Sequence, residues 1–452
     1  MIVSAAFAGK RYAVLGLARS GLSTVETLLA SGAEVMAWDR QAEPRERLEG
    51  RVMLADPLEA DLTGMDGIVV SPGVPLNTHP IAARAEQFGV PVIGDVELFA
   101  LARPDLPPHR VIGVTGTNGK STTVALIDHL MKSARLPSLM AGNIGLPILS
   151  REPLPEGGVY VLELSSYQLD LTRSLACDVA VLTNVTPDHL DRYDGFEAYA
   201  FSKSRLFAMQ ERQQFAAFGC GDATTRALKD AAAQRRDADR VTCADRDALA
   251  EDAANWPALQ GPHNRENAAL AIAAAREIGL DDDAILTGLR SFAGLPHRME
   301  VLGAVNGVTW VNDSKATNPA SAAPALAAFE PDPQPRIHWI AGGLPKGEGL
   351  AECEGELDHV ARAYTIGEAG SQFARALEGT VPVEECELLC EAVRRAALNA
   401  QPGDVVLLSP ACASFDQFRD YEARGDTFRR LVEQLAEAGG DAGEIDCGGA
   451  AA

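Results

Sequence analysis

The 452-residue chain has few of the features that mark membrane or secreted proteins. No uninterrupted apolar stretch approaches the roughly 20 residues of a membrane-spanning helix. The N-terminal segment is slightly apolar, but no basic region precedes it, which argues against a secretory signal. The eight cysteines show neither zinc nor disulfide spacing, and the closest pair, Cys386 and Cys390, falls in an expected helix. We therefore expect a reduced cytoplasmic protein without a membrane partner.

Basic charge is scarce as well. The sequence has 40 lysine and arginine residues against 63 aspartate and glutamate residues, a formal net charge of −23. No basic stripe stands out, so a nucleic-acid duplex is not an expected partner. The acidity does not forbid nucleotide binding, because a phosphate-binding loop uses backbone dipoles, one lysine and a magnesium ion. We expect small-molecule substrates and a monomeric chain.

The segment from Val111 to Thr122 carries the strongest chemical signal. An apolar run typical of a strand leads into a glycine-rich turn, which ends in Gly-Lys-Ser before an apolar-periodic helix. Such a loop directs backbone N–H groups at a polyphosphate, while Lys120 reaches the outer phosphates and Ser121 or Thr122 ligates magnesium. The common spacing would place glycine where Val114 stands, so this is a variant P-loop. The predicted ATP-binding residues here are Gly116, Thr117, Asn118, Gly119, Lys120, Ser121 and Thr122.

The simpler alternative is a glycine turn followed by a surface lysine. The order of strand, loop, Lys-Ser-Thr and helix argues against it, because all four parts of a P-loop then arrive in the right sequence.

Strand and helix patterns alternate in three successive segments, which predicts three α/β domains. Residues 1–107 are expected to form a Rossmann-like domain, residues 108–298 a P-loop domain with a mostly parallel sheet, and residues 299–440 a second Rossmann-like domain. Pro104–Pro108 interrupts both periodicities and is typical of a linker. The glycine- and alanine-rich end of the chain, residues 441–452, is expected to be disordered.

The first segment resembles a dinucleotide-binding unit with a degraded fingerprint. A strand over 11–17, a turn, a helix over 22–31 and a strand over 34–38 are followed by the acidic Asp39. Ala18 stands where the fingerprint has its middle glycine. The pattern leaves three alternatives open: a nicotinamide site, a site for another nucleotide-shaped ligand, or a purely structural unit.

Polar residues follow two expected strands of the middle segment, at the sheet edge where ligands of parallel α/β sheets gather. Glu163 ends the strand expected at 159–164 and is a natural magnesium ligand. His189 follows the strand expected at 178–182 and could bind a second cation, or be a capping or buried histidine. Lys203 lies on the next helix, where a solvated lysine is the alternative.

Three further residues, two on one helix and one at the boundary of the second and third segments, indicate nucleotide contacts. Asn264 and Asn267 sit three residues apart, hence on one face of an alanine-rich helix, where amides could hold a base or ribose or one could act as an N-cap. Arg298 lies at the boundary itself, where a hinge could bring an arginine to phosphate on closure.

These motifs, in chain order from about residue 11 to 430, resemble those of the Mur ligase family. Two further stretches, Asn312–Asn318 and Leu408–Phe418, resemble the member that adds D-glutamate. The motifs that carry the resemblance are Gly116–Thr122, Gly142–Gly145, Glu163–Ser166, Thr183–Asn184 with Asp188–Asp191, His263–Asn267 and His297–Glu300.

The resemblance implies an ATP-dependent amide ligase of cytoplasmic peptidoglycan precursor synthesis. By that resemblance the three domains bind UDP-N-acetylmuramoyl-L-alanine, MgATP and D-glutamate in turn. The substrate carboxylate would form an acyl phosphate, which the D-glutamate amine attacks, giving ADP and phosphate. The alternatives are another Mur-type or folylpolyglutamate synthase-like ligase and, from a different class, an ATP-hydrolysing switch or scaffold.

The resemblance also assigns roles to residues. Lys120, Glu163, His189 and Lys203 would be catalytic, with Ser121, Glu163, His189 and a carbamylated Lys203 at the metal. Further ATP contacts would be Asn264, Asn267, Arg298 and Asp313. The UDP substrate would meet Leu17, Ala18, Asp39, Arg40, Ser71, Asn143 and Ser165, and D-glutamate would meet Thr317, Lys346, Ser414 and Tyr421. Tyr421 departs from the family, which has an apolar aromatic side chain near the glutamate.

Overall fold

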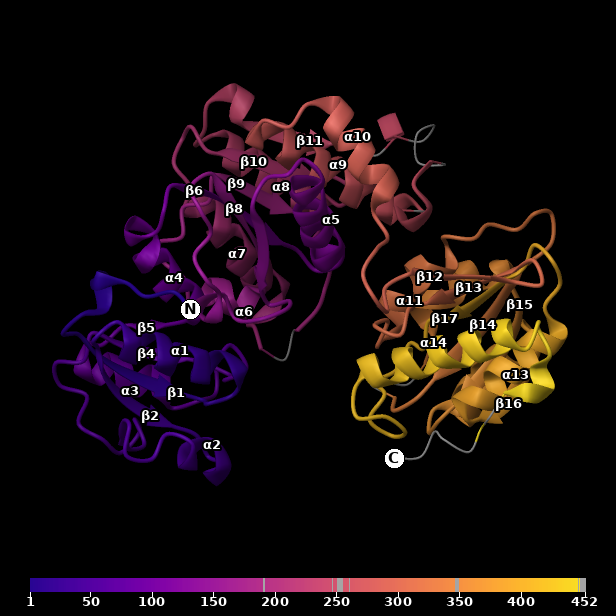
Figure 1. Ribbon diagram of the computed structural model, residues 1–452, viewed down its shortest axis with the longest axis horizontal. Coiled ribbons are helices and arrows are strands. Elements are labelled where there is room, and N and C mark those ends of the chain that lie inside the picture. Colours follow the sequence, from indigo (N-terminus) through magenta and orange to yellow (C-terminus); the bar gives the residue numbers. More distant parts are fainter. Residues whose placement is uncertain are drawn as a thin grey trace. The chain divides into compact units, whose positions relative to one another are not determined.

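A computed structural model describes residues 1–189, 192–245, 247–249, 255–259, 261–345, 349–445 and 447. The chain divides into two compact units, residues 1–246 with 266–289 and residues 247–265 with 290–452 (Figure 1). The first unit holds two sheets and the second holds one, which confirms the predicted architecture of three α/β domains. The domain boundaries expected at residues 107 and 298 stay predictions, because the chain divides into two compact units and the first of them contains two of the expected domains.

The first sheet is parallel, with five strands in the order β3-β2-β1-β4-β5. The strand predicted over 11–17 ends at residue 15, because Gly16 turns the chain with φ +90°. The following helix begins at Arg19 rather than residue 22. The elements are β1 (Arg11–Leu15), α1 (Arg19–Ala30), β2 (Glu34–Trp38), α2 (Ala42–Glu46), β3 (Met53–Leu54), β4 (Gly67–Val70), α3 (Ile81–Phe88) and β5 (Val92–Ile93).

The second sheet is also parallel, with six strands in the order β11-β10-β9-β6-β8-β7. Its central strand β6 leads into the P-loop and lies between β9 and β8, so the polar residues that follow these three strands meet at one edge. The elements are α4 (Asp95–Ala102), β6 (His109–Thr115), α5 (Lys120–Ser133), β7 (Ser138–Gly142), β8 (Gly158–Glu163), α6 (Ser166–Asp170), β9 (Val179–Leu182), α7 (Gly195–Ala208), β10 (Phe215–Gly219), α8 (Ala223–Ala233), β11 (Val241–Ala244), α9 (Pro262–Ile278) and α10 (Asp282–Ser291).

The third sheet has six strands in the order β12-β13-β17-β14-β15-β16, and only β12 runs antiparallel to its neighbour. One buried apolar cluster joins α13 and α14 to one face, and a second joins α11 and α12 to the other. The elements are β12 (Glu300–Val305), β13 (Val308–Asn312), α11 (Pro319–Leu326), β14 (Ile337–Gly342), β15 (Val360–Ile366), α12 (Gly370–Leu377), β16 (Val383–Glu387), α13 (Leu389–Asn399), β17 (Val405–Leu408) and α14 (Tyr421–Glu437).

The last helix begins six residues earlier than the sequence pattern predicts. The expected helix covered residues 427–438, whereas α14 begins at Tyr421. Asp420 is its N-cap and accepts a hydrogen bond from the Ala423 N–H at 2.7 Å. An N-cap aspartate satisfies a backbone donor that the first turn leaves unpaired, so the polar first turn is stable although it has little apolar periodicity.

The cysteines and the C-terminal tail correct two expectations. Cys220 pairs with Cys243, and Cys390 pairs with Cys447, although their spacing in the sequence indicated no disulfide. The predicted disorder does not hold for residues 441–445, because Ala442 and Ile445 are buried in the apolar cluster under α13 and α14. No helix in the described part of the chain is long and apolar enough to cross a membrane.

Candidate active site

The P-loop connects β6 to α5 and depends on two glycines in the left-handed region. Gly116 has φ +148° and Gly119 has φ +83°, conformations that residues with a Cβ rarely adopt. A side chain at Gly119 would also collide with the amide oxygen of Asn267. The loop therefore requires glycine at both positions and brings Asn267, on α9, against its backbone.

Two residues at the end of β9 hold the P-loop in place. The Thr117 N–H donates to the Asn184 carbonyl and the Asn118 N–H donates to the Asn184 side-chain oxygen, both at 2.8 Å. The Thr183 hydroxyl in turn donates to the Asn118 carbonyl at 2.6 Å. These hydrogen bonds fix the loop through the protein's own groups, which is the preorganisation that anion recognition needs.

Lys120 and Lys203 converge on the same backbone carbonyl. Lys120 Nζ donates to the Gly116 carbonyl at 2.9 Å and to the Thr117 carbonyl at 2.7 Å. Lys203 Nζ donates to the Gly116 carbonyl at 2.7 Å and is 1% exposed, so it is not the solvated lysine that was the alternative. Burial, and then the charge of Lys120, lower the pKa of Lys203 well below its usual value.

Glu163 lies where β8 ends and joins two predicted site residues. Its carboxylate accepts a short hydrogen bond from the Ser121 hydroxyl and a 2.8 Å hydrogen bond from the Asn143 side-chain amide. All three residues belong to one edge of the second sheet, and Glu163 is only 3% exposed. Thr122 follows Ser121 on the first turn of α5 and is half-buried.

His189 belongs to a different segment from Ser121 and Glu163, the polar stretch that follows β9. Its backbone is left-handed, with φ +54°, and its side chain is 47% exposed, which excludes a buried structural role. Its ring lies 5.1 Å from that of Tyr167 and 6.3 Å from that of Tyr199. The Leu190–Asp191 end of the same motif lies outside the described residues.

Tyr199 is a site residue that the sequence interpretation missed. Its hydroxyl lies 3.1 Å from the Thr117 hydroxyl, and Lys203 Nζ lies 4.5 Å from its ring centroid. Tyr199 precedes Lys203 by four residues on α7, so both lie on one helical face. That spacing is the signal that could have found it.

The oxygen atoms of Ser121 and Glu163 are suitable ligands for a magnesium ion. Ser121 and Glu163 already touch, and a cation between a hydroxyl and a carboxylate would replace their hydrogen bond. No group of three or more histidine, cysteine or acidic side chains forms a metal cage among the described residues. Magnesium does not need one, because it keeps several waters and takes substrate phosphate oxygens.

The first domain presents an organised turn at the end of β1. The Asp39 carboxylate accepts hydrogen bonds from the Leu17 N–H at 2.6 Å and the Gln41 N–H at 2.9 Å. The Ser71 hydroxyl donates to the Gly16 carbonyl at 3.1 Å. Four residues predicted for the UDP substrate therefore gather at this turn: Leu17, Ala18, Asp39 and Ser71. Arg40, the residue after Asp39, is exposed.

A loop after β7 connects this turn to the P-loop edge. Asn143, at its start, reaches Glu163, while the Gly145 carbonyl accepts a hydrogen bond from Arg19 of the first domain at 3.4 Å. Ser165, predicted to meet the same substrate, caps α6 in a capping box with Gln168. The simplest role of Ser165 is therefore structural, and its substrate contact stays a prediction.

Asp313 is the predicted ATP-binding residue with the most perturbed environment in the second unit. It is 7% exposed, and burial raises its pKa to about 7. Its carboxylate accepts hydrogen bonds from the Ser409 hydroxyl at 2.8 Å and from the Met299 N–H at 3.1 Å. The second of these holds the backbone of the residue that follows Arg298. Asn264, near the start of α9, is 5% exposed.

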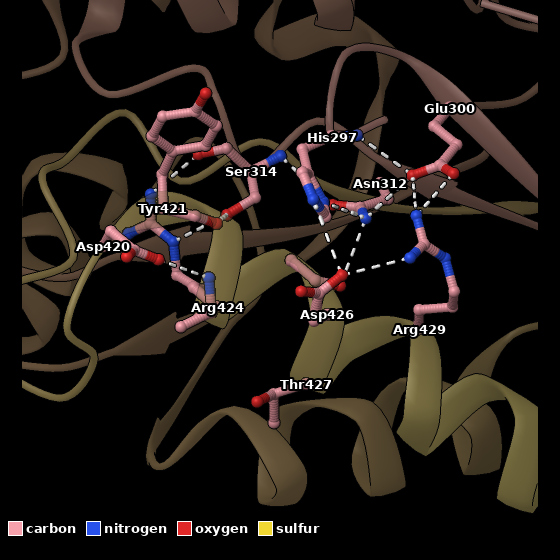
Figure 2. Close-up of polar contacts among 12 residues, drawn as sticks. His297, Glu300, Asn312, Ser314, Asp420, Tyr421, Arg424, Asp426, Thr427 and Arg429 are labelled. Atoms are coloured by element: carbon pink, nitrogen blue, oxygen red, sulfur yellow. Dashed lines mark hydrogen bonds and ion pairs between the residues drawn. The ribbon is translucent and has the colours of Figure 1, made fainter. Parts of the chain in front are cut away.

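A polar network beside Arg298 supports the same segment (Figure 2). His297 lies between Asn312, 3.0 Å from its Nδ1, and Asp426, 3.6 Å from its Nε2. Glu300 accepts hydrogen bonds from Asn312 at 3.1 Å and from Arg429 at 2.6 Å. The segment at residues 297–300 is therefore tied to β13 and α14 on both sides of Arg298.

The residues predicted for D-glutamate follow different strands of the third sheet. Thr317 follows β13 and is half-buried, Ser414 follows β17 and is 2% exposed, and Tyr421 begins α14. The Lys315 ammonium lies 3.8 Å from the Tyr421 ring centroid, a cation–π contact. Lys346 lies outside the described residues.

Comparisons with known proteins cover almost the whole sequence. Family models match residues 10–94 as a Mur ligase MurD-like N-terminal domain, residues 114–275 as a Mur ligase middle domain, and residues 297–412 as a Mur ligase glutamate ligase domain. Three similar relatives are the UDP-N-acetylmuramoylalanine–D-glutamate ligases of Novosphingobium aromaticivorans, Sphingopyxis alaskensis and Zymomonas mobilis. They are 64%, 61% and 54% identical, over 97%, 96% and 96% of this chain and 97%, 100% and 100% of their own lengths.

Solved structures agree on the fold. A MurF ligase of Thermotoga maritima in complex with ADP matches with a TM-score of 0.56 at 15% identity, covering 98% of this chain and 97% of that one. A UDP-N-acetylmuramate–alanine ligase of the same organism matches with a TM-score of 0.55 at 17% identity, covering 95% of this chain and 99% of that one. At these identities the likeness establishes the fold alone.

Proposed function

This chain belongs to the Mur ligase family, and from that premise we propose that it has UDP-N-acetylmuramoylalanine–D-glutamate ligase activity. The observation that carries this conclusion is identity of 54–64% over nearly the full chain to three relatives with that activity in their names. The protein is therefore an enzyme of peptidoglycan precursor synthesis. We also propose that it acts in the cytoplasm as a monomer.

The reaction joins two substrates through a phosphorylated intermediate. An alanyl carboxylate oxygen attacks the γ-phosphorus of ATP, the bond to the β-phosphate oxygen breaks, and ADP leaves. The D-glutamate amine then attacks the acyl carbon, loses a proton, and inorganic phosphate departs as the amide forms. Both steps bring anions together, so catalysis requires positioning and positive charge more than covalent help from the protein.

The preformed P-loop is the proposed site of the ATP phosphates. The N-terminal end of α5 and the Lys120 ammonium would cradle them, with Asn267 held against the loop. Asn264, Arg298 and Asp313 are proposed to complete the ATP site. Ser121 and Glu163 would hold one magnesium ion and His189 a second, and magnesium would offset phosphate charge when bound.

Lys203 is proposed to carry a carbamate, formed by its amine and CO₂. Its ammonium shares the Gly116 carbonyl with the half-buried Lys120, so two like charges lie close together. Conversion of Lys203 to an anion would replace their repulsion with attraction and add an oxygen ligand on the metal side. The full burial of the side chain supports this proposal, since it shields a carbamate from water.

The turn at the end of β1 is the proposed site of the UDP part of the substrate. Asp39 organises the N–H groups of residues 17 and 41, while Arg40 is exposed beside it. Asn143 sits on the loop that runs from this turn to Glu163, which suits a residue close to the reacting end of the same substrate. Thr317, Lys346, Ser414 and Tyr421 are proposed for D-glutamate.

One experiment tests the function against its alternatives. Purified protein would be given ATP, magnesium and UDP-N-acetylmuramoyl-L-alanine with D-glutamate, L-glutamate or a diamino acid, and phosphate release would be measured. We expect release only with D-glutamate. Equal release without any amino acid would indicate an ATP-hydrolysing switch, and preference for the diamino acid would indicate another member of the family.

A further inference from the structure

Arg424, on the first turns of α14, is a buried cation in an unusual setting. The residue is 1% exposed, and burial lowers its pKa to about 10. Figure 2 shows Arg424 beside Ser314. Within the described part of the chain, its guanidinium donates only to uncharged acceptors: the Ser314 hydroxyl at 3.0 Å and the carbonyls of Ser314, Cys412 and Ala413 at 2.9, 3.0 and 3.2 Å. Burying a guanidinium without a hydrogen-bonded carboxylate is costly, so a stable protein retains one for a reason.

The acceptors lie on two of the segments that carry predicted D-glutamate residues. Ser314 precedes Thr317 by three residues after β13, and Ala413 immediately precedes Ser414 after β17. The Ser314 hydroxyl also donates to the Tyr421 carbonyl at 2.8 Å, which ties the start of α14 to the same group. One side chain thus fixes the backbone beside three of the four predicted residues.

The third segment, which follows β14, joins through the backbone. Leu344 and Ala413 exchange two hydrogen bonds, Leu344 N–H to the Ala413 carbonyl at 2.9 Å and Ala413 N–H to the Leu344 carbonyl at 3.0 Å. The Ala413 carbonyl therefore accepts from Leu344 and Arg424 together. Gly343 has φ +130°, and a side chain there would press on the Ala413 carbonyl and the guanidinium. The sequence thus leaves room for the guanidinium at the junction of all three segments.

We propose that Arg424 is a positioning residue for the amino-acid site, where its buried guanidinium holds the three segments in register and adds positive charge beneath a substrate with two carboxylates. The proposal rests on the proposed function and deepens it. With 1% exposure the side chain does not reach the substrate, and it acts through the backbone that it binds. A field from a fixed, desolvated cation favours an anionic ligand over a neutral one.

The test compares Arg424→Lys, which keeps the charge but loses the planar fork, with Arg424→Gln, which loses the charge but keeps amide donors. Arg430→Gln is the matched control, because Arg430 is an exposed arginine on the same helix. We expect Arg424→Gln to raise the KM for D-glutamate by at least roughly tenfold, the loss of one charge-assisted contact. Arg424→Lys should raise it less. The KM values for ATP and the UDP substrate should stay near those of the wild type and of Arg430→Gln.

Chemical rescue separates positioning from general stability. Arg424→Ala leaves a cavity of guanidinium shape, so millimolar guanidinium should lower its KM for D-glutamate, while the same concentration of sodium chloride should not. An unchanged KM for D-glutamate in folded Arg424→Gln would overturn the proposal. A parallel rise of all three KM values would also overturn it, as would Arg424→Lys being no better than Arg424→Gln. Absence of D-glutamate-dependent phosphate release in the wild type would instead refute the proposed function.

Discussion

Replacement of Lys120 by alanine is expected to remove most of the ligase activity and leave the fold intact. Lys120 Nζ bonds the Gly116 and Thr117 carbonyls at 2.9 and 2.7 Å, which fixes the ammonium along the loop where phosphate charge must be offset. Losing one well-placed transition-state contact costs about 3 kcal/mol, roughly a hundredfold in rate. We expect a loss of about that size in kcat.

The loop itself should survive this substitution. Its backbone is anchored independently by Asn184 and Thr183 through the hydrogen bonds to residues 117 and 118. Alanine removes two hydrogen bonds from a half-buried side chain, each worth about 1 kcal/mol in net stability. Thermal unfolding should therefore shift by only a few degrees.

The assay is phosphate release at saturating concentrations of all three substrates, together with thermal unfolding. Lys132→Ala is the matched control on the same helix, because Lys132 is exposed and pairs with Asp128, four residues earlier. The control should retain wild-type turnover. A Lys120→Ala protein that unfolds like the wild type and turns over at the wild-type rate would refute the assignment of this loop to the ATP phosphates.

Four other substitutions probe the remaining parts of the site. Lys203→Ala should be nearly inactive and partly restored by acetate, which fills the vacated anion site; an electron-density map with a bare ammonium in an active, liganded crystal would contradict the carbamate. Asp39→Ala should raise the KM for the UDP substrate at least roughly tenfold through loss of two charge-assisted hydrogen bonds, and an equal rise in the KM for ATP would argue against a UDP site. Lys346→Ala should raise the KM for D-glutamate at least roughly tenfold, and Ser414→Ala less; equal KM values in the wild type and Lys346→Ala would make that lysine a solvated surface charge.

The sequence predicted the parts of the middle domain whose signals are local. The P-loop, the strand before it and the helix after it appear within two residues of their expected positions, because strand, glycine turn and amphipathic helix each leave a distinct pattern. Strands β10 and β11 were missed. Phe215–Gly219 has two phenylalanines but no β-branched residue, and its alanines and glycine disfavour a strand, so the strand depends on pairing with the neighbouring β9.

The burial of single charged residues was beyond the reach of the sequence. Lys203 and Arg424 both lie on helices whose patterns allowed exposed cations, and each is 1% exposed. Their burial depends on carbonyls that come from segments 87 residues away for Lys203 and 110 residues away for the Ser314 contact of Arg424. Only the folded chain brings such groups together. Asp420 could have been recognised in the sequence as the N-cap of α14, and that assignment would have placed Arg424 inside the helix.

The close approach of Gly119 and Asn267 bears on inhibitor resistance. Any larger residue at position 119 would need a left-handed backbone and would displace the Asn267 amide, so the loop and its neighbour would both change shape. An inhibitor that binds the main chain at position 119 would therefore contact a surface that no tolerated point mutation at this position can change. Resistance to such an inhibitor would then require altered expression, efflux or substitutions at other positions.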